Sequence, residues 1–146
     1  MKKAVGISFF VAALLSCSPH IAQATQPSAA TLATYGLHYG TVNHLSSIST
    51  LDQAIASGAQ VVVKFGASWC GPCRQMAPVI SQVASELTSV IFIDVNFDSF
   101  KELAQRYGIK SIPAILLFKN GSEVARTIGF KDKSSLTNLI KNSFGL

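Results

Sequence analysis

Apolar residues recur along this chain with two different periods. The run Gln60–Phe65 is rich in β-branched residues and almost continuously apolar, which predicts a central strand covered on both faces, with Lys64 as its one discordant residue. Between Cys70 and about Leu87, apolar residues recur every three or four positions, and this spacing predicts a long helix with one buried face. Pro78 falls inside that helix and removes one backbone donor, so we expect a kink there.

The chain from about residue 41 continues this alternation of strands and helices. The further predicted elements are, in chain order, a weak strand at Val42–Ile48, a short helix with Ser49 or Thr50 as its N-cap that runs through Ser57, a strand at Val90–Val95, a helix at Ser99–Tyr107, strands at Ala114–Phe118 and Glu123–Ile128, and a helix at Lys133–Asn142. Asn120-Gly121 predicts a two-residue hairpin turn, because both positions need positive φ. This order predicts an α/β fold, with a mixed central β-sheet flanked by helices on both faces.

The first 24 residues have the organisation of an export signal. Met1-Lys2-Lys3 is a short positive segment, and Ala4–Leu15 is an uncharged apolar run that is too short to span a bilayer. Ala22-Gln23-Ala24 has the small-x-small form of a signal-peptidase site. We therefore expect residues 1–24 to be a signal peptide and the domain to work outside the cytoplasm, in the periplasm or cell envelope.

A second interpretation of the N-terminus remains open. Leu14-Leu15-Ser16-Cys17 resembles a bacterial lipobox, in which residues 1–16 form a lipoprotein signal and Cys17 becomes the lipidated N-terminus. The protein would then be held at a membrane surface. Without that lipid, we expect no membrane association.

The composition is that of one compact soluble domain. The full chain has 146 residues, of which 49% are hydrophobic and 13% charged. Residues 25–40 are rich in Ala, Thr, Ser and Gln without apolar periodicity and predict a flexible leader, so that the domain occupies residues 41–146. The 12 basic residues are scattered rather than clustered, which argues against nucleic-acid binding. We found no insertion suited to dimerisation and expect a monomer.

The sequence Trp69-Cys70-Gly71-Pro72-Cys73 lies where the buried strand ends and the long helix begins. A helix N-terminus carries unpaired N–H groups and a partial positive charge, which stabilise a thiolate, the form that attacks disulfides. With two intervening residues, the second sulfur can reach the first, so we assign Cys70 as the nucleophile and Cys73 as the resolving cysteine.

Two other interpretations of the cysteine pair are weaker. A zinc site needs four ligands, and the chain has no second pair of cysteines, while His38 and His44 lie near the edge of the domain. We therefore expect no metal. An inert structural disulfide would not account for the aromatic residue and the Gly-Pro around the pair.

The cysteine motif after Val61-Val62-Val63-Lys64-Phe65, together with Ile112-Pro113 and Lys119-Asn120-Gly121, resembles the thioredoxin family over residues 41–146. The resemblance implies the thioredoxin fold, reduction of protein disulfides, and no cofactor beyond the redox-active Cys70–Cys73 disulfide. It also implies that Pro113 is cis beside the cysteines and that the backbone of Ile112 pairs with an extended substrate. From the residues alone, Pro113 could equally be trans.

Further positions match the family, and one pair departs from it. Trp69 matches the rim of the family's active site, Gly129 the floor of its substrate groove, and Pro78 its helix kink. Where thioredoxins usually carry a buried Asp that serves the resolving cysteine, this chain has Lys64, and where bacterial members often have a Lys it has Asp94. If the strands pair as in the family, the two form a buried ion pair, and we hypothesise that Asp94, or Lys64 in its neutral form, transfers the proton of Cys73. Alternatively, Lys64 reaches water at the end of the sheet.

Three functions fit these features. The leading one is a protein-disulfide reductase, re-reduced by a membrane-borne electron donor because its compartment is oxidising. The second is a disulfide oxidase or isomerase, although Gly71-Pro72 between the cysteines resembles reductants more. The third is a non-catalytic module that binds partners through a groove at Trp69, Ile112 and Pro113.

Overall fold

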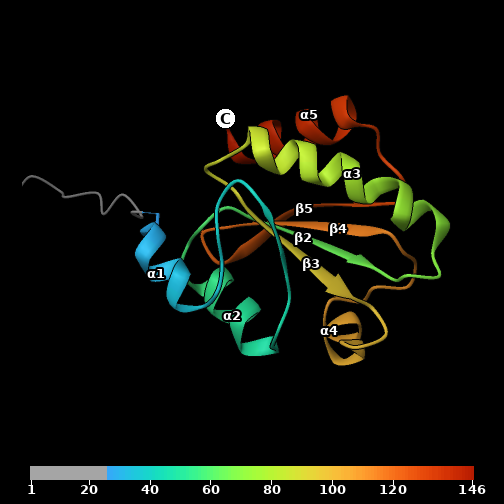
Figure 1. Ribbon diagram of the computed structural model, residues 1–146, viewed down its shortest axis with the longest axis horizontal. Coiled ribbons are helices and arrows are strands. Elements are labelled where there is room, and N and C mark those ends of the chain that lie inside the picture. Colours follow the sequence, from blue (N-terminus) through green and yellow to red (C-terminus); the bar gives the residue numbers. More distant parts are fainter. Residues whose placement is uncertain (1–25) are drawn as a thin grey trace, which may run out of the picture.

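The computed structural model describes residues 26–146, and the order of its elements agrees with the prediction, with one helix added at the N-terminus (Figure 1). The strands are β1 (Val42–His44), β2 (Val61–Gly66), β3 (Ile91–Asn96), β4 (Ala114–Lys119) and β5 (Ser122–Ile128). The helices are α1 (Ala29–Thr34), α2 (Ile48–Ala56), α3 (Gly71–Glu86), α4 (Lys101–Arg106) and α5 (Lys133–Phe144).

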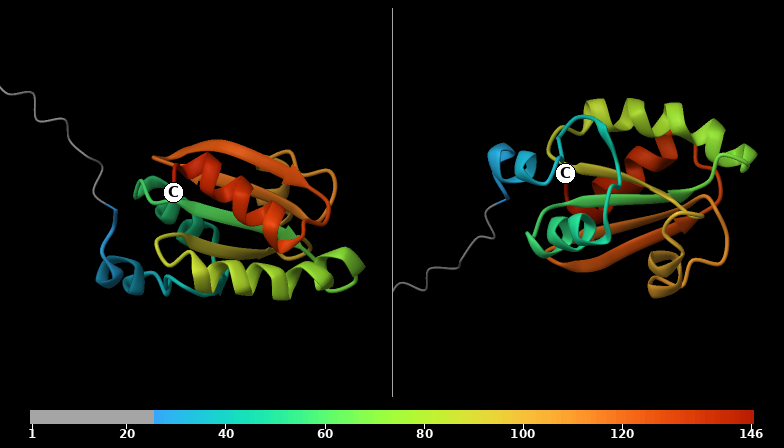
Figure 2. Two further views of the ribbon diagram at one scale, coloured as in Figure 1. Left: turned by 90° about the horizontal axis from the view of Figure 1, so that it is seen from above. Right: turned by 60° about the horizontal axis from the view of Figure 1, so that its bottom comes forward.

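The five strands form one mixed sheet in the order β1-β3-β2-β4-β5. Strands β1, β3 and β2 are parallel, whereas β4 runs antiparallel to β2 and β5 antiparallel to β4. Helices α3 and α5 cover one face, and α2 and α4 lie on the other (Figures 1 and 2). The predicted mixed sheet with helices on both faces is confirmed.

The central strand β2 supplies both hydrophobic cores, because successive side chains of a strand point to opposite faces. Val61, Val63 and Phe65 belong to the core on the side of α2, whereas Val62 belongs to the core beneath α3 and α5. Lys64 has the same parity as Val62. The alternation therefore places the one charged residue of β2 under α3, the helix that begins at the cysteines.

The folded region begins earlier than the predicted boundary at residue 41. Residues 29–34 form α1, and the side chains of Leu32 and Leu37 are buried in the core on the side of α2. Because this helix has only six residues and buries a single leucine, it leaves no periodic apolar pattern that a sequence can reveal. Much of the segment predicted as a flexible leader, residues 25–40, therefore packs against the domain.

The predicted signal segment, with Cys17, lies outside the described residues. In the region from residue 26 onward, no helix is both long and apolar enough to cross a membrane. Helix α1 stands at the end of the sheet opposite the start of α3, so the described chain enters the domain far from the cysteines (Figure 1).

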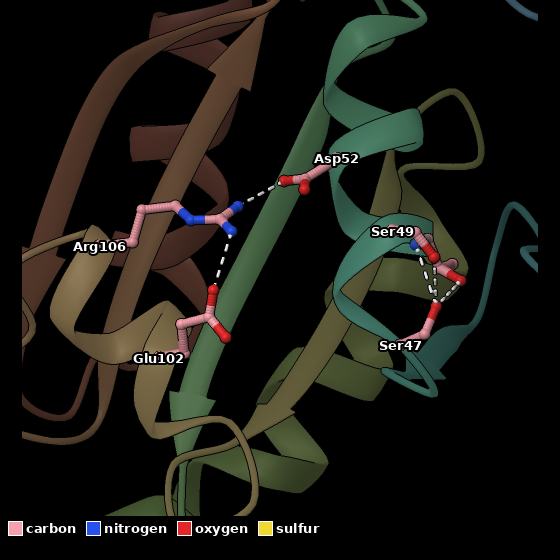
Figure 3. A network of polar contacts seen from close by, with 6 residues as sticks. Ser47, Ser49, Asp52, Glu102 and Arg106 are labelled. Atoms are coloured by element: carbon pink, nitrogen blue, oxygen red, sulfur yellow. Dashed lines mark hydrogen bonds and ion pairs between the residues drawn. The ribbon is translucent and has the colours of Figure 1, made fainter.

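Helix α2 begins slightly earlier than predicted, and β1 is correspondingly shorter. The N-cap of α2 is Ser47, whose Oγ accepts a hydrogen bond from the backbone N–H of Thr50 at 3.2 Å. The hydroxyl of Ser49 lies 2.9 Å from the same Oγ (Figure 3). Four neighbouring hydroxyl residues, Ser46, Ser47, Ser49 and Thr50, are each acceptable caps, so the sequence does not distinguish between them.

An ion-pair network joins α2 to α4 on the same side of the sheet. The guanidinium of Arg106 lies 2.8 Å from the carboxylate of Asp52 and 3.5 Å from that of Glu102 (Figure 3). All three side chains are substantially exposed, so the network is expected to contribute little to stability.

Candidate active site

The two cysteines form a disulfide in the first turn of α3. Cys70 is the N-cap of the helix, and its Sγ accepts a hydrogen bond from the backbone N–H of Cys73 at 3.2 Å. The Cα atoms are 5.2 Å apart. Gly71 and Pro72 occupy the first two helical positions, where proline is tolerated because N–H groups there have no helical partner.

The surroundings of the disulfide differ on its two sides. On the outer side, Trp69 is 65% exposed, and its indole Nε1 donates a hydrogen bond to Asp98 at 2.8 Å. Beside the sulfurs, Ala67, Phe97 and Ile112 form a small apolar cluster. Trp69 is thus a fixed rim over an otherwise covered disulfide. Asp98 lies in the loop after β3, and no pattern in the sequence points to it.

The loop before β4 lies against the outer cysteine. The Sγ of Cys70 is 3.8 Å from the carbonyl oxygen of Ile112, and the peptide bond between Ile112 and Pro113 is cis, the isomer that the resemblance implied. The carbonyl of Pro113 accepts a hydrogen bond from the N–H of Gly129 at 2.8 Å. Gly129 has a φ of 85°, which favours glycine at this position. The residues predicted for the groove on this side are thus joined by direct contacts.

Comparison with known proteins agrees with this geometry. The family model of Thioredoxin matches residues 42–142, which is most of the chain. The chain belongs to the thioredoxin family.

Relatives of this thioredoxin-family chain come from several bacteria. It is 48% identical over 94 residues to the thioredoxin of Chlamydia pneumoniae, a match that covers 64% of this chain and 91% of the relative. It is 38% identical over 99 residues to the thioredoxin of Mycoplasma pneumoniae, covering 68% and 97%.

Solved thioredoxin structures show the same fold. A mutant thioredoxin from Halobacterium salinarum superimposes with a TM-score of 0.69 at 28% identity, over 75% of this chain and 96% of that one. A thioredoxin from Plasmodium falciparum gives a TM-score of 0.65 at 33% identity, over 68% and 97%. The chain is therefore a protein-disulfide oxidoreductase that acts through its Cys-X-X-Cys pair. Thioredoxins need no cofactor beyond that disulfide.

Lys64 and Asp94, the two residues that depart from the family pattern, form a direct ion pair. The two residues are register partners on β2 and β3, and Lys64 Nζ lies 2.7 Å from Asp94 Oδ1. The side chain of Lys64 is 9% exposed and that of Asp94 is 23% exposed. Lys64 therefore does not extend to water at the end of the sheet; its charge is neutralised inside the domain.

A cavity of about 320 Å³ opens beside this ion pair, and we call it the Gly66 cavity. Its lining is His44, Leu45, Lys64, Gly66, Ala67, Ser68, Cys73, Arg74, Ala77, Asp94 and Asn96. A Cβ at Gly66 would stand 2.8 Å from Cε of Lys64 and 3.4 Å from Cβ of Cys73. Gly66 thus leaves the space between the amine and the resolving cysteine open, a role that the sequence analysis missed.

The described residues also bear on metal binding. Between residues 26 and 146, no three His, Cys, Asp or Glu side chains are grouped so that they could hold a metal ion. His38 and His44, the candidates weighed from sequence, do not meet at the cysteines. The backbone N–H and C=O of His38 bond the side chain of Asn43, whereas His44 faces Asp94.

Proposed function

We propose that this chain reduces disulfide bonds of proteins in the periplasm or cell envelope, with Cys70 as the nucleophile and Cys73 as the resolving cysteine. One observation carries the proposal: the disulfide lies at the N-terminus of α3 with different surroundings for its two sulfurs. Cys70 borders the carbonyl of Ile112 at the predicted groove. Cys73 is 2% exposed and borders the Gly66 cavity instead.

The first step uses the thiolate of Cys70. Its sulfur caps α3, where the N–H of Cys73 and the helix dipole favour negative charge. The thiolate attacks one sulfur of a substrate disulfide, a Cys70–substrate disulfide forms, and the substrate's own S–S bond breaks. The departing substrate sulfur leaves as a thiolate and takes a proton from water.

The second step uses Cys73. After losing its proton, Cys73 attacks the sulfur of Cys70, so that the Cys70–Cys73 bond forms and the mixed disulfide breaks. Two electrons have then passed from the dithiol to the substrate, which leaves as a dithiol. The Lys64–Asp94 pair borders the same cavity as Cys73, and the ammonium of Lys64 favours the thiolate of that residue.

The location rests on the N-terminal sequence. The positive Met1-Lys2-Lys3, the apolar Ala4–Leu15 and the small residues Ala22 and Ala24 support export. In an oxidising compartment the disulfide is not re-reduced by a cytosolic thiol pool, so the proposal requires a membrane-borne electron donor. Fractionation with mass spectrometry of the mature N-terminus tests this. Thr25 as the first residue supports a soluble periplasmic protein, a lipidated Cys17 supports a membrane-held one, and an unprocessed cytoplasmic chain contradicts export.

The direction of the reaction is tested by the equilibrium reduction potential of the cysteine pair. Thioredoxins that act as reductants have potentials of about −270 mV, whereas strong oxidants lie near about −120 mV. Redox titration with a thiol-trapping readout measures the value. A strongly negative potential supports the reductase, and a potential near the oxidising end would make the chain an oxidase or isomerase.

The roles of the two cysteines are tested by trapping. Mixed with a protein disulfide such as that of insulin, a Cys73→Ser variant is expected to accumulate a mixed disulfide, whereas Cys70→Ser is not. If the trapped sulfur belonged to Cys73 instead, the assignment would be reversed. A Cys70→Ala/Cys73→Ala double variant that still supports the cellular role would identify a non-catalytic binding module.

The role of the ion pair is tested separately. In a Lys64→Met variant we expect slower turnover and an altered titration of the cysteines, because the cation next to Cys73 is gone. A variant with unchanged turnover and unchanged cysteine titration would contradict a role of Lys64 in proton transfer.

A further inference from the structure

Three polar residues lie side by side across the sheet, directly under α3. His44 on β1 is the register partner of Asp94 on β3, and Asp94 is the register partner of Lys64 on β2. Register partners on adjacent strands place their side chains on the same face of the sheet. The strand pairing itself therefore brings the imidazole of His44 next to the ion pair. We call His44, Asp94 and Lys64 the polar row.

The polar row runs from the interior to solvent. The carboxylate of Asp94 uses a different oxygen for each neighbour: Oδ1 lies 2.7 Å from Nζ of Lys64, and Oδ2 lies 3.5 Å from Nδ1 of His44. The side chains are 9% exposed at Lys64, 23% at Asp94 and 83% at His44. Of the three, only His44 is freely accessible to bulk water.

The inner end of the row meets the resolving cysteine. Both Nζ of Lys64 and Cβ of Cys73 lie close to the point where a side chain of Gly66 would begin, at 3.1 and 3.4 Å. The Gly66 cavity borders Cys73 and all three members of the row, and a second cavity of about 150 Å³ borders the row as well. Cavities of this size have room for water, and the polar atoms of the row offer it hydrogen-bond partners, so that water can bridge gaps in the row.

The cavity lies apart from the groove that we assign to the substrate. Trp69, Ile112, Pro113 and Gly129 do not line it. A protein bound over that groove would therefore leave the Gly66 cavity and His44 in contact with water. The second reaction step needs such a route, because the proton of Cys73 has to leave while the substrate is still attached to Cys70.

We propose that His44 is a positioning residue for the resolving step: it forms the solvent end of a proton path that runs from Cys73 through Lys64 and Asp94. The inference rests on the proposed function. As Cys73 gives up its proton and bonds to Cys70, Lys64 accepts that proton and passes another to Asp94, so its charge is unchanged. Asp94 passes the proton to His44, which releases it to water. Imidazole exchanges protons readily near neutral pH, which suits this position.

The other charged group at the cavity does not interrupt this path. Arg74 of α3 borders the cavity, and its guanidinium donates a hydrogen bond to the carbonyl of Ser68 at 3.0 Å. The charged and titratable side chains that line the cavity are thus the polar row, Arg74 and Cys73 itself. The test therefore compares substitutions that leave Arg74 in place.

The experiment compares His44→Gln with His38→Gln in the full chain. Glutamine keeps a polar side chain of similar size but cannot carry the proton. His38 is exposed and does not line either cavity, so it is the matched control. Single-turnover reactions with insulin disulfide are followed between about pH 5 and 8, the range in which histidine titrates. In a Cys73→Ser background the same mixing measures the attack of Cys70 alone.

In His44→Gln we expect resolution by Cys73 to slow by roughly tenfold and to lose part of its pH dependence. This slowing is smaller than the loss of roughly hundredfold or more expected for a group that takes the proton from the reacting atom itself, because His44 acts through Lys64 and Asp94. The attack of Cys70 should be unchanged, and His38→Gln should match the unmodified chain in both steps. If His44→Gln and His38→Gln have the same resolution rate at every pH, the path through His44 is refuted while the reductase stands. If the Cys73→Ser background forms no mixed disulfide with insulin, the proposed function fails first.

Discussion

The polar row predicts that Lys64 and Asp94 contribute to stability only as a pair. Replacing Asp94 with leucine would leave the ammonium of Lys64 without a partner at 9% side-chain exposure. Breaking a buried ion pair from one side costs about 3–5 kcal/mol, because the remaining charge loses both its partner and water. We expect Asp94→Leu to lower the free energy of unfolding by an amount in this range.

Replacing Lys64 instead of Asp94 should lower the stability by less, because the two partners are not equally buried. In Lys64→Met the carboxylate of Asp94 remains 23% exposed and still has the imidazole of His44 at 3.5 Å. A partly solvated group that loses one partner costs roughly 1–3 kcal/mol. The order of the two single variants is therefore itself a prediction from the exposures.

The double variant Lys64→Met/Asp94→Leu removes both charges and leaves apolar side chains of similar size beneath α3. Such replacements of buried pairs are often close to neutral, so we expect its stability within about 1 kcal/mol of the unmodified chain. The coupling between the two sites is then at least about 3 kcal/mol, at the upper end of the range found for residues in direct contact.

Urea denaturation of the oxidised protein, with fluorescence of Trp69 as the signal, measures all four proteins under one set of conditions. The midpoint should fall in the single variants while the slope m is retained, which indicates a change in stability alone. If the effects of the two substitutions simply add, or each costs less than about 0.5 kcal/mol, then the pair is solvated like an exposed salt bridge and the burial argument is wrong.

Three further outcomes are expected. Leu32→Ala should destabilise the domain by about 2–5 kcal/mol in the same urea assay, because Leu32 is buried although it precedes the predicted domain boundary; no loss would mean that α1 is not part of the core. The backbone N–H and the hydroxyl of Ser135 hydrogen-bond the carboxylate of Asp132 and lower its pKa below the ordinary 3.8, so the stability gained over Asp132→Asn should be complete above about pH 5 and vanish as the pH falls through the lowered pKa. Finally, redox titration should give Lys64→Met/Asp94→Leu a potential more negative by on the order of 30 mV, and an unchanged or less negative value would contradict an influence of Lys64 on the cysteines.

The central part of the fold was predictable from short stretches of sequence. The strand predicted at Gln60–Phe65 is β2 at Val61–Gly66, and the helix predicted from Cys70 to about Leu87 is α3 at Gly71–Glu86. Both are buried elements with many apolar residues, and their patterns are strong because tertiary packing demands them. The cysteine motif could also be identified from the sequence, since its chemistry depends on the spacing of two residues within one helical turn.

The N-terminal part was less predictable for a physical reason. Helix α1 contributes one buried leucine, and Leu37 reaches the core from a loop. A pattern needs several apolar residues at regular spacing, and two leucines five positions apart in a polar segment do not provide one. Their burial depends on the surface that the rest of the domain offers, which is a tertiary property.

The polar row was only half predictable. The pairing of Lys64 with Asp94 followed from the resemblance, but His44 was weighed only as a metal ligand. Its neighbours are set by the pairing of β1 with β3, which are separated along the chain by α2, β2 and α3. Register between such distant strands leaves no local signal. The space at Gly66 was hidden for the same reason, because its value lies in the approach of Lys64 to Cys73.

The exchange of charges between Lys64 and Asp94 leaves the attraction within the ion pair unchanged, but it changes the electrostatic surroundings of the cysteines. Reversing a pair keeps its attraction, yet it changes which charge lies on β2, the strand that leads to the motif. Here Lys64 and Cys73 approach the same space over Gly66, whereas Asp94 lies beyond Lys64, toward His44. A cation next to a sulfur favours its thiolate and hence the reduced pair, which makes the disulfide easier to reduce and the potential less negative. Gly71-Pro72 between the cysteines resembles reductants instead, so we expect the potential of this chain to be set by the balance between the two.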